Sequence, residues 1–355
     1  MKMGIKRLMV CVFVIAAFLG YSIAAFAEGI IPFTDSAGRQ VGLPLSIQRI
    51  APSGQLAQIM LYSLCPDKLT GWSIKPGNAF TPYLPETMKA LPVFGQYYGK
   101  NVSLNLEALI LARPDVIIDI GERKPSIKED MDSIQQQTGI PVVFIEATLD
   151  TMPAAYEMLG RLAGMEKEAT ELCKYASDTV RDVQRLRKII DDDQMVRVYY
   201  AQGEDGLATD PSGSIHADVI DLIGAKNVAD ITFTSGAGMN KVSMEQVLAW
   251  RPDVVLFARS TAFQAAVSDP IWNQLKAAED GRFYEIPEEP FHWLGSPPSI
   301  NRLLGIKWLG NLLYPDVYVY DMAAEAQKFF RLFYHFDLSS QAAKNLMAHS
   351  TYLEK

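Results

Sequence analysis

The chain of 355 residues is about twice the length of an ordinary domain, which favours two domains over one. Hydrophobic residues make up 49% of it and charged residues 21%, a mixture that excludes a disordered or low-complexity protein. Acidic residues outnumber basic ones by 41 to 33, so the net charge is −8 and a nucleic-acid-binding surface is not expected. An anionic partner must therefore meet a local basic site.

The first 27 residues have the pattern of a secretory signal peptide. Lys2, Lys6 and Arg7 form a basic start, an uncharged apolar run covers residues 8–19, and Ala-Phe-Ala stands at 25–27. The run is shorter than the roughly 20 residues of a membrane-spanning helix. We expect a cleaved signal without a lipid anchor, and an exported chain with 30 basic and 41 acidic residues, a net charge of −11.

Cysteine and histidine usage does not indicate a metal site. Cys65 and Cys173 of the mature chain both lie in apolar helical patterns, where a buried free thiol is the commoner outcome, although an oxidising compartment leaves a disulfide open. The four histidines show no paired zinc-binding spacing, so we expect no metal bound directly by side chains and no resident cofactor. His292 is the one candidate for contact with a metal centre inside a ligand.

One segment occurs twice in the chain, 138 residues apart. Residues 105–118 (NLEALILARPDVII) return as residues 243–256 (SMEQVLAWRPDVVL), with Glu, Arg, Pro, Asp and Val in register. Each copy predicts a short helix with Asn105 or Ser243 as its N-cap, a proline that stops it, and a buried parallel strand. Two copies predict two similar α/β lobes.

Hydrophobic periodicity predicts strands and helices that alternate in both lobes, an order typical of mostly parallel sheets. The expected strands are residues 49–51, 69–72, 116–120, 142–145, 196–201, 254–258 and 283–286. The expected helices are residues 55–64, 126–138, 151–163, 215–223, 299–313 and 321–334.

Between the repeats lies a long amphipathic segment, residues 166–190, which predicts about 37 Å of continuous helix between the lobes. The predicted fold class is thus α/β, with two Rossmann-like lobes of mostly parallel sheet joined by one long α-helix. The predicted boundaries are the signal at 1–27, the first lobe at 28–164, the interlobe helix at 165–193 and the second lobe at 194–355.

Five stretches resemble, in the right order, the periplasmic binding proteins for ferric siderophores, haem and vitamin B12. They are residues 33–50, 106–115, 222–228, 244–253 and 297–309. The resemblance implies a class III, helical-backbone binding protein: a monomeric, non-enzymatic periplasmic component of an ABC importer that holds its ligand between two lobes. It also implies that Glu107 and Glu245 dock onto arginines of the membrane permease, and a first-turn glutamate is well placed for a cationic partner.

Ligands of parallel α/β sheets bind beyond the carboxyl ends of the strands. Arg123 and Arg259 stand only two positions apart when the repeats are aligned, which predicts one guanidinium on each cleft wall for a carboxylate, catecholate or oxyanion. The expected cleft residues are Ser53, Gly54, Tyr97, Tyr98, Arg123, Tyr200, Gln202, Asn240, Arg259, His292 and Trp293.

The expected ligand is a metal complex, first of all a ferric siderophore or related iron chelate, because flat aromatic rings suit such ligands. Six residues before each docking glutamate, where vitamin B12 binders have tryptophan, this chain has Asn101 and Met239, which argues against cobalamin. Haem or cobinamide stays open, as does an oxyanion such as molybdate or tungstate. Candidate donors to an oxyanion are Ser53, Thr209, Asn240 and Ser260.

Two functions of other classes stay open at this point. Two Rossmann-like lobes also build enzymes, but the sequence has no G-x-S-x-G elbow, no P-loop and no complete dinucleotide fingerprint. An exported ligand sensor would keep the cleft and lack permease docking, so Glu107 and Glu245 separate it from a transport protein.

Overall fold

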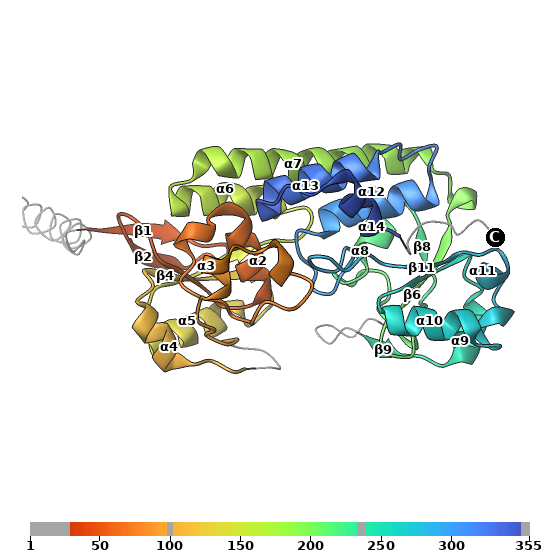
Figure 1. Ribbon diagram of the computed structural model, residues 1–355. Helices are drawn as coiled ribbons and strands as arrows, with labels where there is room; N and C mark the ends of the chain where they lie inside the picture. The colour runs from red at the N-terminus through yellow and green to blue at the C-terminus, as the bar shows by residue number, and fades with distance from the viewer. Residues whose placement is uncertain (1–28, 98–101, 233–238, 349–355) are drawn as a thin grey trace, which may run out of the picture.

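The computed structural model describes residues 29–97, 102–232 and 239–348, which form two α/β lobes beneath a layer of long helices (Figure 1). The predicted signal peptide and Tyr98 lie outside the described residues. The first sheet has the order β3 (Ile50–Pro52), β4 (Val116–Gly121), β5 (Val142–Glu146). The second has the order β11 (Phe283–Glu285), β10 (Val254–Phe257), β6 (Arg197–Ala201), β8 (Lys226–Asn227). All pairs in both sheets are parallel, which confirms the predicted fold class.

The remaining elements surround the two sheets. The longer helices are α2 (Gln55–Leu64), α5 (Ile127–Thr138), α6 (Met152–Ala163), α7 (Glu166–Leu186), α10 (Ser260–Ser268), α12 (Arg302–Leu313) and α13 (Met322–Tyr334). The shorter ones are α3 (Glu86–Lys89), α4 (Leu106–Ala112), α8 (Asp218–Leu222), α9 (Met244–Trp250), α11 (Lys276–Glu279) and α14 (Ser340–Asn345). Two antiparallel pairs complete the structure, β1 (Ile30–Thr34) with β2 (Gln40–Pro44) and β7 (Ala208–Thr209) with β9 (Asn240–Lys241).

Several predicted elements differ from the structure. The helices expected at 215–223 and 299–313 both begin three residues later, at Asp218 and Arg302. The strand expected at 69–72 forms only isolated bridges, Leu69 to Ile50 and Trp72 to Val93. The long helix α7 ends at Leu186 and a 3₁₀ turn follows, so its length is about 31 Å. The segment changes its pairing partner along its length, from Ile50 at Leu69 to Val93 at Trp72, so no continuous ladder forms with either neighbour.

The lobes are joined by a helical layer rather than by α7 alone. In Figure 1, α6, α7, α12 and α13 run side by side above both sheets, and one hydrophobic core extends from the first lobe through this layer into the second. Helix α13 returns to the first lobe, where the Tyr334 ring lies 5.8 Å from that of Phe80. Just after the helix, Nε2 of His335 donates a hydrogen bond to the Tyr62 carbonyl at 3.2 Å. The predicted boundary at 194 stays a prediction, but the chain beyond it packs on both lobes.

The repeated segments have matching local structure. The side chain of Asn105 accepts a hydrogen bond from the Ala108 N–H, and the Ser243 hydroxyl accepts one from Gln246, as expected for N-caps. In both copies the arginine before the proline takes a left-handed conformation, with φ of 45° and 46°. The aspartate of each Arg-Pro-Asp then accepts a hydrogen bond from the backbone at the neighbouring strand, Asp115 from Arg49 and Asp253 from Arg197.

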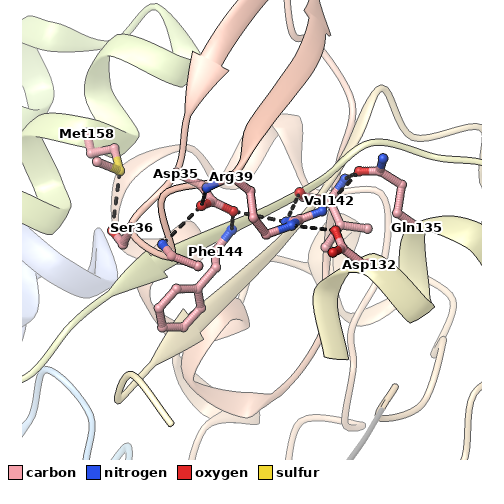
Figure 2. Close-up of polar contacts among 9 residues, drawn as sticks. Asp35, Ser36, Arg39, Asp132, Gln135, Val142, Phe144 and Met158 are labelled. Atoms are coloured by element: carbon pink, nitrogen blue, oxygen red, sulfur yellow. Dashed lines mark hydrogen bonds and ion pairs between the residues drawn. The ribbon is translucent and has the colours of Figure 1, made fainter. Parts of the chain in front are cut away.

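The β1–β2 hairpin is fastened to the first lobe by a buried ion-pair network (Figure 2). Asp35 accepts hydrogen bonds from the backbone N–H groups of Ala37 and Arg39 and from that of Phe144 on β5. The buried Arg39 guanidinium pairs with Asp35 at 2.9 Å and donates to the Val142 carbonyl at 2.8 Å. The side chains of Asp35 and Arg39 therefore stabilise the hairpin against the first lobe. The strands of this hairpin are absent from the strands expected from the sequence.

Candidate functional site

A cavity of about 550 Å³ opens between the lobes, at the carboxyl ends of β6 and β10. The first lobe contributes the start of α2 and the loop 74–80, and the second lobe contributes most of the wall. The lining residues used below are Lys75, Phe80, Tyr200, Gln202, Glu204, Met239, Arg259, Glu288, Pro290, Phe291 and His292. This position agrees with the rule that α/β proteins bind ligands beyond their strand ends.

Charged groups of both signs line the cavity. Arg259, at the N-terminus of α10, forms no ion pair within 4 Å in the described part of the chain, and Lys75 is exposed on the opposite lobe. Glu288 is half-buried; burial raises the pKa of its carboxyl, and the positive charge of Arg259 opposes that rise. A guanidinium without a fixed partner is available to an anionic ligand.

His292 is held as a neutral ring in the cavity wall. Its Nδ1 accepts hydrogen bonds from the backbone N–H groups of Leu294 and Gly295, at 3.2 and 3.3 Å. Burial lowers the pKa of the imidazole to about 3, with a further contribution from the positive charge of Arg259. Because Nδ1 accepts, the proton of the neutral ring is on Nε2, which is buried and has no hydrogen-bond partner among the described residues. The ring therefore presents a spare N–H donor.

Tyr200 supplies a second donor beside His292, with the two ring centroids 6.1 Å apart. Its hydroxyl is buried and makes no well-aligned hydrogen bond with any residue in the ranges 29–97, 102–232 and 239–348, although the Gln202 side chain lies close enough to interact with it. Burial raises the pKa of the phenol, so the hydroxyl keeps its proton. The neighbouring Gln202 amide donates to Asp210 at 3.0 Å. An unpaired buried donor is costly unless a ligand or water satisfies it.

The structure brings four of the predicted cleft residues together: Tyr200, Gln202, Arg259 and His292 all line the cavity. Six of the other seven predicted residues do not line it, and the seventh, Tyr98, lies outside the described residues. Ser53 is buried and bonded to Asp119, Gly54 caps α2, Tyr97 and Trp293 lie in the core, Asn240 contacts the Thr209 carbonyl, Arg123 is exposed after β4, and Tyr98 is not described. Trp293 packs edge-on against Trp308, whereas its neighbour His292 lines the cavity.

Sequence reasoning missed the first lobe's contribution to the cavity. Lys75, rather than Arg123, is the cationic side chain on that wall. It follows the edge segment at 69–72, so the rule of strand carboxyl ends could have found it. Met239, which replaces the cleft tryptophan of vitamin B12 binders, lines the cavity and is 58% exposed.

The two predicted docking glutamates lie on α4 and α9, at the same edge of the molecule and away from the helical layer (Figure 1). Both carboxylates are exposed in the first turn of their helices. Hydrogen bonds from Ser243 and from its own backbone N–H lower the pKa of Glu245. Both lobes thus present an exposed glutamate in the first turn of a short helix.

The periplasmic binding protein family model matches residues 81–290, more than half of the chain. The chain belongs to this family. It is 27% identical to the molybdate-binding protein MolA of Haemophilus influenzae over 349 residues, which covers 88% of this chain and 94% of MolA. A vitamin B12-binding protein of Pectobacterium carotovorum is 27% identical over 186 residues, 52% of this chain and 62% of that protein.

Solved structures of the family share the fold. An ABC transporter solute-binding protein of Sulfurospirillum deleyianum superposes with a TM-score of 0.83 at 28% identity, covering 89% of this chain and 99% of that one. These relatives confirm a class III binding protein of the iron and vitamin B12 type, and the family is one of binding proteins rather than enzymes. Among the described residues, no helix is both long and apolar enough to cross a membrane.

The buried neutral histidine gives this binding protein a defined acid sensitivity. The unfolded chain binds a proton at His292 near pH 6.5, whereas the folded chain does so only near pH 3, so stability is lost as the pH falls from about 6.5 towards 3. By pH 4 we expect the loss from this group to be about 3 kcal/mol. Urea unfolding at pH 7, 5 and 4 should show a steeper loss in the wild type than in His292→Gln. Parallel losses in the two proteins would contradict the assignment, and His335→Gln serves as the histidine control.

Proposed function

We propose that the chain captures an anionic ligand with oxygen atoms at its surface in the interlobe cavity, and delivers it from the periplasm to an ABC permease. The observation that carries the proposal is the pair of unpartnered buried donors, His292 Nε2 and Tyr200 Oη, beside the guanidinium of Arg259. Each of the three offers a proton and none of them offers a negative charge. The family membership supports transport in a monomeric form after signal cleavage.

We place an oxyanion such as molybdate or tungstate first among the ligands. A compact oxyanion can accept hydrogen bonds from a phenol, an imidazole and a guanidinium at once, and such charge-assisted bonds are stronger than neutral ones. MolA, whose name states molybdate binding, is similar to this chain over nearly the whole length of both proteins. The ferric siderophore, which is the first ligand expected from the sequence, becomes the second candidate.

The iron chelate is supported by the size and apolar parts of the cavity. Its volume of about 550 Å³ lies within the range of sites for drug-sized ligands. Phe80, Phe291 and Pro290 form an apolar wall next to the donors, which suits a citrate or catecholate complex. No tryptophan is among the described residues that line this cavity, and Met239 stands where a cobalamin binder has one, so cobalamin and cobinamide rank below both.

The ligand class can be tested by calorimetric titration with molybdate, tungstate, sulfate, ferric citrate, a ferric catecholate, haem and cobalamin. We expect molybdate or tungstate to bind most tightly. The variant Arg259→Gln should lose about 10- to 100-fold in affinity, because a hydrogen bond to a charged group contributes about 1.5–3 kcal/mol. Tyr200→Phe should lose up to about 10-fold, since it removes one neutral donor.

The matched control is Arg185→Gln, an exposed arginine on the helical layer that should leave affinity unchanged. If Arg123→Gln, rather than Arg259→Gln, weakened binding, the ligand would lie at the wall that the sequence predicted. If none of the seven ligands bound below millimolar concentration, the capture function itself would lose its support.

A further inference from the structure

Helix α4 exposes large apolar side chains on the side that faces away from the first sheet. Leu106 is 38% exposed, Ile110 53% and Leu111 74%, and Val102 just before the helix is 60% exposed. Leu109 and Ala112 are buried and anchor the opposite side of the helix in the second core cluster of this lobe. Glu107 is the one polar residue in the sequence LEALILA, so the solvent face of this helix is unusually apolar.

The exposed residues form one continuous face that includes the docking glutamate. At 100° per residue, Leu106 and Ile110 stand in one row along the helix, and Glu107 and Leu111 stand in the next. The negative charge of Glu107 is thus flanked by three apolar side chains. Clusters of this kind on a protein surface mark interaction sites, whereas single exposed apolar residues need no explanation.

The corresponding helix of the second lobe has a different surface. In the repeat alignment Leu106, Ile110 and Leu111 correspond to Met244, Leu248 and Ala249. Met244 and Leu248 are partly buried against the core of the second lobe. The solvent side of α9 consists of Glu245, Gln246 and Ala249. The two docking helices match in charge and differ in apolar surface.

We propose that the exposed face of α4, formed by Leu106, Glu107, Ile110 and Leu111, is an apolar anchor that docks on the ABC permease, whereas α9 docks through charge alone. The inference rests on the proposed function, because it takes the permease as the partner of Glu107. The face is continuous with that docking residue, and no other cluster of three large exposed apolar residues stands on a single helix of the described chain. The partner surface is expected to hold a basic residue surrounded by apolar ones.

The apolar residues would act on the ion pair as well as by their own burial. Excluding water around the Glu107 carboxylate lowers the local dielectric and strengthens its attraction to a cation. Glu245 has no such ring of apolar neighbours, so its ion pair stays hydrated and more sensitive to salt. The two lobes are then not equivalent on the permease, and the binding protein docks in one preferred orientation.

The test compares the full mature chain with its Ile110→Ser/Leu111→Ser variant, binding to the permease complex in lipid nanodiscs at low and high salt. We expect the variant to lose about 10- to 30-fold in affinity, mainly through faster dissociation, and to become more salt-sensitive than the wild type. The matched control is Val319→Ser, which replaces a 77% exposed apolar residue in the segment between α12 and α13. Ligand affinity and the unfolding midpoint should be unchanged in both.

Each outcome of this test supports or overturns one claim. If the wild type binds, Glu107→Arg disrupts binding and the apolar variant binds like the wild type, the apolar anchor is wrong and the transport function stands. If the wild type does not bind and Glu107→Arg changes nothing, the transport function fails. Sedimentation that shows a wild-type dimer lost in the apolar variant would assign the face to a second copy of the chain. The single variant Leu111→Gln repeats the comparison if the double variant has a lowered unfolding midpoint.

Discussion

Reversing both docking charges, in the variant Glu107→Arg/Glu245→Arg, should abolish ligand uptake while ligand binding by the free protein stays unchanged. Both carboxylates are exposed in the first turns of α4 and α9, and neither glutamate is among the described residues that line the cavity. A like charge against a cationic partner costs several kcal/mol, so two reversals should lower permease affinity by at least about 100-fold. Uptake of radiolabelled ligand into proteoliposomes measures the effect.

The matched control for charge reversal is Glu166→Arg/Glu168→Arg. These glutamates are also exposed in the first turn of a helix, α7, which lies on the opposite side of the molecule from α4 and α9 (Figure 1). The control should transport like the wild type. Normal uptake by the Glu107/Glu245 reversal would contradict docking through these residues and favour the ligand-sensor alternative. The single reversals should give intermediate losses.

The fold could be predicted in large part because local signals and global architecture agree. The helix α2 was predicted at 55–64 and spans the same residues, and both repeat helices begin at the predicted caps Asn105 and Ser243. Proline, a capping side chain and a β-branched run act over a few residues, so a single sequence reveals them. The β1–β2 hairpin was not predicted because a contact that stabilises it, the hydrogen bond from Arg39 to the Val142 carbonyl, joins residues 103 positions apart.

The candidate site was less predictable, because long-range packing decides which side of a strand end faces the cleft. Arg123 and Lys75 both follow strands or bridges of the first lobe, yet only Lys75 lines the cavity. His292 and Trp293 are adjacent in the sequence but lie in different places: His292 lines the cavity, and Trp293 packs against Trp308. The packing of α13 against the first lobe depends on aromatic contacts such as that between Phe80 and Tyr334. These residues are far apart in the sequence, so a local sequence pattern does not predict their contact.

The segment that carries His292 is held by an ion pair between the fully buried Arg302 and the partly exposed Asp218. Breaking this pair gives the largest stability effect that we expect. Arg302 begins α12, is fully buried, and donates to the Asp218 carboxylate at 2.5 Å and to the Ile215 carbonyl at 3.3 Å. Its Nε donates to the Ser299 carbonyl at 3.3 Å. The pair therefore connects the start of α8 to the end of the segment between β11 and α12, which includes the cavity residues Phe291 and His292.

The variant Asp218→Asn should lower the free energy of unfolding by about 3–5 kcal/mol at pH 7, because it leaves the Arg302 guanidinium buried without a counter-charge. Removing both charges in Asp218→Leu/Arg302→Met should recover much of that loss, since a desolvated pair is itself only weakly stabilising. Urea denaturation followed by circular dichroism measures both, with Asp337→Asn as the control for an exposed pair with Arg331. If Asp218→Asn and Asp337→Asn changed stability equally, the buried pair would not be what holds the cavity segment in place.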